Sequence, residues 1–212
     1  MSNGGDERAP RFSMLREFEV ADVLTLGNAA CGTTTLFLCM QFLAEGERGW
    51  LWCAFLLLPT AFILDALDGW VARKLNRGSR LGADLDSLAD VISFGVAPAA
   101  LAYTLGARGG WDVMILVGFV CCGIARLARF NVTAEELSDG HSGKVRYFEG
   151  TPIPTSLLLV VVLALAFSQG AVYRNLWGGA VRLGPFGWHP LTSLYALSGA
   201  AMVSGRLRIP KP

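Results

Sequence analysis

Six apolar stretches run through this chain of 212 residues, and each is close to the length that crosses a lipid bilayer. A membrane-spanning helix needs about 20 apolar residues, because every backbone N–H and C=O must be paired within the segment. Only 17% of the residues are charged, against about 25% in an average soluble protein. The sequence therefore predicts an all-α, polytopic membrane protein. Its six expected transmembrane helices lie near residues 21–44, 50–73, 83–106, 111–131, 152–173 and 187–205.

We expect one six-helix domain at 21–205, followed by a short tail at 206–212. Residues 1–20 mix charged side chains with Phe12 and Leu15, a pattern compatible with a short interfacial helix and equally with a polar tail. They contain no long apolar run, so no cleavable signal peptide is expected.

The lysine and arginine residues predict an orientation. All but four of the 18 basic residues fall in the two terminal segments and in the connections near 74–82 and 132–151. Basic loops stay in the cytoplasm. We therefore expect an integral protein of the cytoplasmic membrane, with both termini and the active site facing the cytoplasm. The net charge of +1 gives no reason to expect a nucleic-acid partner.

The five cysteines lie in apolar stretches, which favours packing over disulfides or metal binding. His141 stands in a polar connection and is expected to face solvent. His189, beside Pro190 on the opposite side, is expected at the membrane interface.

Two pairs of aspartates stand at the facing ends of the second and third spans. Asp65 and Asp68 are three residues apart, and Asp86 and Asp90 are four apart, so each pair shares one helix face. A short connection makes the two spans antiparallel, which brings all four carboxylates to a similar depth. Acidic residues at this depth are rare and usually face a cavity or a partner. Two divalent cations would compensate the four charges, and oxygen ligands favour Mg²⁺, Mn²⁺ or Ca²⁺ over zinc.

Two such cations suit an in-line displacement at phosphorus, because they hold the attacking and leaving oxygens together. Gly69, Ala72 and Gly82 are small residues beside the acids, and they fit either the approach of a bulky headgroup or close helix packing. Asp84 points to the other helix face, so we interpret it as a first-turn acid favoured by the helix dipole and not as a ligand.

The pattern Asp-x2-Asp-Gly-x2-Ala-Arg-x8-Gly-x3-Asp-x3-Asp resembles the signature of the CDP-alcohol phosphatidyltransferase family. Its eight fixed positions are Asp65, Asp68, Gly69, Ala72, Arg73, Gly82, Asp86 and Asp90. Three further stretches are similar to the phosphatidylserine synthase branch of that family: Leu85–Pro98, Arg126–Asn131 and Gly150–Pro154.

The resemblance implies that Asp65, Asp68, Asp86 and Asp90 bind two ions, Mg²⁺ or Mn²⁺. Asp90, the last acid of the set, would also be the general base. The residues implied in binding the CDP-lipid are Thr25, Gly69, Ala72, Arg73, Ser79 and Gly82. The family often has Pro-Asn ahead of Thr25 where this chain has Ala21-Asp22, which leaves a role for Asp22 in doubt.

The function implied is transfer of a phosphatidyl group from CDP-diacylglycerol to L-serine, with release of CMP. Arg126, Arg129 and Asn131 are candidates for binding the serine carboxylate, because arginine recognises carboxylates bidentately. Both arginines are equally compatible with anchoring to lipid phosphates. Membrane lipids are expected partners, and homodimers are frequent in the family.

Three alternatives stay open at this point. Glycerol phosphate or inositol phosphate could be the acceptor, or the donor could be an archaeal-type ether lipid. A cation transporter would explain acids within membrane spans, although not Arg73 beside them. A purely structural membrane protein would leave the four acids without a purpose.

Overall fold

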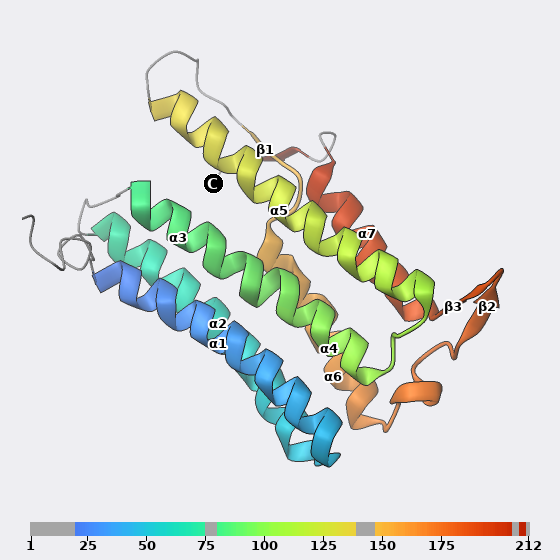
Figure 1. The fold of residues 1–212 in the computed structure, drawn as a ribbon. Coiled ribbons are helices and arrows are strands. Elements are labelled where there is room, and N and C mark those ends of the chain that lie inside the picture. The colour runs from blue at the N-terminus through green and yellow to red at the C-terminus, as the bar shows by residue number, and fades with distance from the viewer. Residues whose placement is uncertain (1–19, 75–79, 139–146, 205–207, 211–212) are drawn as a thin grey trace, which may run out of the picture.

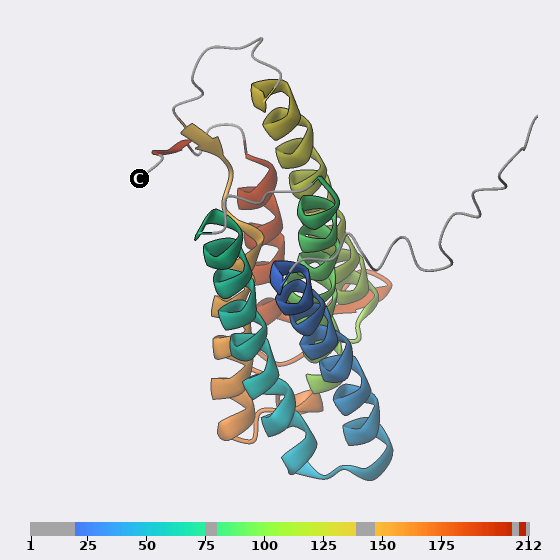
Figure 2. The same cartoon turned by 90° about the vertical axis from the view of Figure 1, so that its left-hand side faces the viewer.

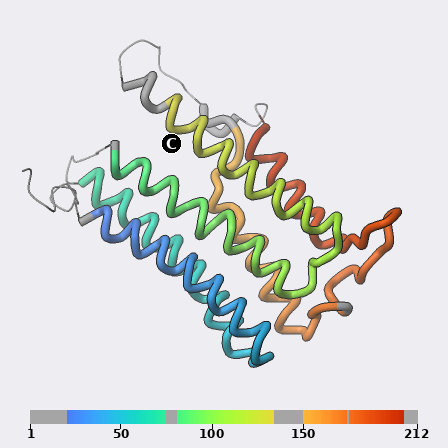
Figure 3. The backbone as a smooth tube through the Cα atoms, in the orientation of Figure 1, coloured from blue at the N-terminus to red at the C-terminus, as the bar shows by residue number. Residues whose placement is uncertain are grey.

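The computed structural model describes residues 20–74, 80–138, 147–204 and 208–210, and these form a bundle of mostly antiparallel helices (Figure 1). The expected interfacial helix in residues 1–20, Ser79, His141 and most of the C-terminal tail lie outside the described residues. Figure 3 traces the path of the chain, from the paired first two helices (blue and cyan) to the last helix (red).

Four helical segments among the described residues are long and apolar enough to cross a membrane. They are α1 (Val20–Glu45), α2 (Arg48–Lys74), the continuous run α3–η2–α4 and α5 (Gly110–Ser138). The run consists of α3 (Arg80–Asp90), a π-helical segment η2 (Val91–Val96) and α4 (Ala97–Leu105). These four segments coincide with the first four predicted spans. Their length and apolar composition indicate an integral membrane protein.

The fifth and sixth apolar segments are shorter than predicted. A 3-10 turn, η3 (Ile153–Ser156), leads into α6 (Leu157–Ser168), and η5 (Pro190–Thr192) leads into α7 (Ser193–Val203). The fifth stops early because the chain turns at Gly170, where φ is +74°. The sixth starts late because a hairpin occupies the residues before Pro190. A mostly helical protein is confirmed, and membrane crossing by α6 and α7 stays a prediction.

Two small antiparallel sheets depart from the all-α prediction. Strand β2 (Val181–Leu183) pairs with β3 (Phe186–Trp188), after a 3-10 turn η4 (Tyr173–Asn175). Strand β1 (Tyr147–Glu149) pairs with β4 (Arg208–Pro210), which lies in the segment expected to be a tail. Each strand has three residues, too few to produce a recognisable alternating pattern.

The third apolar run forms the centre of the bundle. In its most apolar window, 67% of Leu81–Leu105 is buried, against 28% in each of the first two spans and 22% in Gly110–Thr133. Leu101 and Leu105 are fully buried, whereas Leu56 and Leu158 on outer helices are about 70% exposed. Helices with apolar residues on both the packed and the outer face are typical of proteins surrounded by lipid. Figure 2 shows the helices running side by side along one direction.

A buried polar cluster joins the start of α5 to α7. Asp112 accepts hydrogen bonds from the backbone N–H groups of Gly109 (2.9 Å) and His189 (2.8 Å) and from the hydroxyl of Thr192 (3.0 Å). Its Oδ2 also lies 2.6 Å from His189 Nδ1. His189 is only 6% exposed. The contact with Asp112 holds the ring inside the bundle, and the position of His189 at the membrane interface stays a prediction.

We predict that Asp112→Ala destabilises the fold. Removing one partner of a buried charged network typically costs about 3–5 kcal/mol, because the remaining polar groups are left unpaired. The thermal midpoint of the purified protein in detergent should fall well below that of the wild type. The exposed acid Glu47 provides the control, and Glu47→Ala should leave the midpoint nearly unchanged. Equal midpoints for Asp112→Ala and the wild type would contradict the prediction.

Candidate active site

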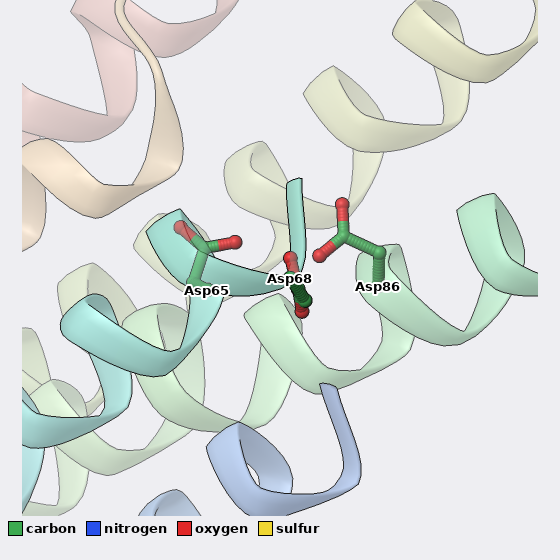
Figure 4. A group of neighbouring side chains, drawn as sticks. All are labelled: Asp65, Asp68 and Asp86. Carbon is green, nitrogen blue, oxygen red and sulfur yellow. The ribbon is translucent and has the colours of Figure 1, made fainter. Parts of the chain in front are cut away.

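Three aspartates converge where the end of α2 faces α3. One carboxylate oxygen from each of Asp65, Asp68 and Asp86 lies within 4.8 Å of the other two. Figure 4 shows the three side chains pointing toward one another from two separate helices. The spacing of three between the first two acids places both on the face of α2 that meets α3.

This cluster is chemically suited to a divalent cation. Asp86 Oδ1 is buried and has no hydrogen-bond partner, although buried polar atoms almost always have one. Like charges at separations of 4–5 Å repel strongly where water is scarce. A hard cation among the oxygens would satisfy Asp86 Oδ1 and cancel that repulsion, so the donor set fits Mg²⁺ or Mn²⁺.

Asp90 lies one turn further along the same helix as Asp86 and outside the 4.8 Å group. It is only 7% exposed, and its Oδ1 accepts a hydrogen bond from Asn28 Nδ2 on α1 at 3.3 Å. The π-helical segment begins at the next residue. The fourth acid of the motif thus lies outside the group formed by the other three and bonds to Asn28 on α1.

The first helix contributes a polar stripe that faces the acids. Thr25 donates a 2.6 Å hydrogen bond to Asp68 Oδ2, and Asp22, Thr25 and Asn28 are all at most 3% exposed. The sequence prediction assigned Thr25 to the CDP-lipid, whereas the structure places its hydroxyl on Asp68. Asn28 did not figure in that prediction. Asn28 could have been found from its spacing, because Asp22, Thr25 and Asn28 are polar residues three apart in an otherwise apolar helix.

The small residues of the motif lie beside an arginine. A Cβ atom added to Gly69 would come within 3.4 Å of Arg73 Nη1, so the guanidinium lies over the glycine. Arg73 is exposed, and Ala72 and Gly82 are half-buried. Gly69 has no side chain and Arg73 has an exposed guanidinium, and this combination is compatible with the binding of a phosphate group.

The residues proposed for the acceptor come from α5. Asn131 Nδ2 donates to Ser87 Oγ (3.0 Å), and Ser87 directly follows Asp86. Arg126 is half-buried and close enough to Asp90 for their charges to attract, whereas Arg129 is exposed. The structure therefore brings Arg126 and Asn131 to the acids and leaves Arg129 on a more open face of the helix.

A partly buried group of acids at one end of apolar helices defines an integral membrane protein with a candidate site for divalent cations. The family follows from comparison with known proteins. Residues 18–188 match the CDP-alcohol phosphatidyltransferase family, and the chain belongs to that family. The resemblance inferred from the eight-position motif is thereby confirmed.

Similar proteins occur in a yeast, a bacterium and an archaeon. The chain is 43% identical over 203 residues to the CDP-diacylglycerol–serine O-phosphatidyltransferase of Saccharomyces cerevisiae, covering 95% of this chain and 74% of that protein. It is 32% identical over 152 residues to the Bacillus subtilis enzyme of the same name, covering 69% and 75%. It is 40% identical over 143 residues to the archaetidylserine synthase of Methanothermobacter thermautotrophicus, covering 66% of this chain and 54% of that protein.

We predict that Asp86→Asn weakens divalent-cation binding by roughly tenfold or more, because it removes a charged ligand. Thermal stabilisation of the purified protein by added Mn²⁺ measures this without any turnover. Asp84→Asn is a matched control, since Asp84 is an exposed aspartate only two residues away. If both variants respond to Mn²⁺ as the wild type does, Asp86 is not a ligand.

Proposed function

We propose that this chain transfers a phosphatidyl group from CDP-diacylglycerol to the hydroxyl of L-serine, giving phosphatidylserine and CMP. The observation that carries the proposal is the convergence of Asp65, Asp68 and Asp86 within a family of phosphatidyl transferases. The serine specificity is supported by the names of the yeast and Bacillus subtilis relatives. The name of the archaeal relative, archaetidylserine synthase, also supports serine as the acceptor. It names a different lipid product, so it does not support CDP-diacylglycerol as the donor.

In the proposed reaction, the serine hydroxyl oxygen attacks the phosphorus that carries the diacylglycerol. The bond from that phosphorus to the oxygen bridging to CMP breaks, and CMP leaves with the electron pair. The hydroxyl proton passes to Asp90, whose carboxylate lies apart from the three converging acids. Two divalent ions held by Asp65, Asp68, Asp86 and Asp90 would supply charge stabilisation for the attacked phosphate and for the leaving CMP.

Arg73 is proposed to bind a phosphate of the CDP-lipid. Its exposed guanidinium lies over Gly69, within 3.4 Å of where a Cβ atom would stand at that position. Ala72, Gly82 and Ser79 complete the proposed CDP-lipid contacts. Thr25 would act through Asp68, to which it donates its hydrogen bond, and would contact the nucleotide only secondarily.

Recognition of serine is proposed to involve Arg126 and Asn131. Arg126 is half-buried on the side of α5 that approaches Asp90, so a carboxylate bound there would sit near the base. Asn131 is held against α3 through Ser87. The exposed position of Arg129 is better suited to a lipid phosphate at the membrane surface.

The membrane topology is proposed to have six crossings, with both termini and the active site on the cytoplasmic side. The η3–α6 and η5–α7 segments, Ile153–Ser168 and Pro190–Val203, would span only about 24 and 21 Å as straight helices. They therefore need their flanking residues or a locally thinner bilayer to cross. The basic connections beside the acids support a cytoplasmic site. A homodimer remains a prediction.

We predict CMP release from CDP-diacylglycerol that requires both a divalent cation and serine. Asp90→Asn should lower kcat by about 10²–10⁴-fold, because a positioned base contributes that much. Asp84→Asn should keep wild-type activity. A panel of labelled serine, glycerol phosphate and inositol phosphate identifies the acceptor. Absence of metal-dependent CMP release with every alcohol would refute the enzyme, and preference for another alcohol would refute the serine assignment.

A second prediction concerns the serine carboxylate. Arg126→Ala should raise the KM for serine by roughly 10- to 100-fold, since a charge-assisted hydrogen bond to a carboxylate is lost. Arg126→Lys should recover only part of the loss, because lysine cannot bind the carboxylate bidentately. Arg129→Ala, one turn along the same helix, should change the KM much less. An unchanged KM in both alanine variants would rule out carboxylate binding by either arginine.

A further inference from the structure

We propose that Asn28 of α1 is a positioning residue for Asp90, holding this carboxylate in place through a two-point attachment between α1 and the π-helical segment. The inference rests on the proposed function, in which Asp90 accepts the serine proton. Asn28 lies outside the eight-position motif, on a helix that the motif does not include.

Asn28 makes two hydrogen bonds to the segment around Asp90. Its side-chain nitrogen donates to Asp90 Oδ1 at 3.3 Å, and its backbone carbonyl accepts a 2.9 Å bond from the hydroxyl of Ser93. This orientation of the amide suits an ionised Asp90, because a carboxylate accepts from the NH₂ group and has no proton to donate to the amide oxygen. One residue of α1 therefore holds both Asp90 and the residue three positions later.

The two helices meet so closely there that a side chain would not fit. A Cβ atom added to Gly32, one turn beyond Asn28, would lie 2.4 Å from Ser93 Oγ and 2.8 Å from Ser93 Cα. Neither contact is sterically possible, so the glycine is required for this approach. Gly32 thus lets α1 come near enough for the backbone carbonyl of Asn28 to reach Ser93.

The attachment falls at the junction between α3 and the π-helical segment. A π-helical turn carries an extra residue and rotates the side chains before it relative to those after it. Here that turn, Val91–Val96, separates Asp90 from the fully buried core of α4. Bonds to Asp90 and to Ser93 fix this rotation, and with it the direction in which the Asp90 carboxylate points.

A second observation favours a role in function over a role in folding alone. Asn28 is 0% exposed, and yet its Oδ1 has no hydrogen-bond partner. A buried asparagine selected only for packing would be expected to have both ends of its amide satisfied. An open acceptor beside the base is instead suited to a donor group of the incoming alcohol.

The test is the steady-state kinetics of full-length Asn28→Ala in mixed micelles with CDP-diacylglycerol, serine and Mn²⁺. We expect kcat to fall roughly 10- to 100-fold, because a base displaced by about 1 Å loses that much rate. The KM for CDP-diacylglycerol should stay within about twofold, since the metal-facing acids of α2 and α3 are intact. Thr35→Val is the matched control. It alters another fully buried polar residue of α1, whose hydroxyl bonds only its own helix at Cys31, and should keep wild-type kcat.

The same substitution in an Asp90→Glu background separates positioning from general damage. The longer carboxylate no longer matches the amide of Asn28, so Asn28→Ala should cost much less there than in the wild type. An equal loss in both backgrounds, or a wild-type kcat for Asn28→Ala, would overturn the proposal. If Asn28→Ala does not fold, Ser93→Ala replaces it, with a smaller fall in kcat expected and an unchanged kcat overturning the two-point attachment. Failure of the proposed function looks different, because the wild type would then release no CMP or Asp90→Asn would remain fully active.

Discussion

Mutual repulsion among carboxylates gathered at one end of a hydrophobic bundle is the constraint on which the rest of the structure depends. Two unit charges 4 Å apart interact by about 4 kcal/mol at the effective dielectric of a protein site. Asp65, Asp68 and Asp86 keep their oxygens within 4.8 Å of one another despite this cost. Helix α1 packs against both α2 and α3 and donates the hydrogen bond from Thr25 to Asp68, so it holds the two acid-bearing helices together against this repulsion. The three acids thus form a cluster that could hold a divalent cation.

The scaffold keeps these helices in place from the opposite end. The central run α3–η2–α4 is fully buried at Phe94, Leu101 and Leu105, so the helix that carries Asp86 and Asp90 is anchored in the core. At the far end, Asp112 joins α5 to α7 through His189 and Thr192. Polar clusters therefore lie at both ends of an apolar bundle. Both carboxylate oxygens of Asp112 are hydrogen-bonded at one end, whereas Asp86 Oδ1 has no hydrogen-bond partner at the other.

The spacing of the aspartates predicted that all four acids converge, and the structure shows this for three of them. Residues three and four apart share a helix face, and two antiparallel spans then bring the acids together, as Asp65, Asp68 and Asp86 show. The π-helical segment could not be predicted, because no periodicity distinguishes Val91–Val96 from an ordinary apolar helix. The burial of His189 also escaped prediction, since its partner Asp112 is 77 residues away in the sequence. Contacts of this kind depend on tertiary packing, which local patterns do not encode.

Asn28 is a neutral hydrogen-bond donor to Asp90, and its lack of charge matters in a site formed by four acids. A lysine or arginine there would also donate to Asp90, but its positive charge would compete with the divalent cations for the carboxylates. An amide donates without changing the net charge, so the acids keep their full attraction for metal ions. A neutral donor on α1 and a glycine one turn later at Gly32 therefore serve the same end, because both bring the first helix against Asp90 without neutralising it. The aspartates of α2 and α3 supply the charge, and α1 determines how that charge is oriented.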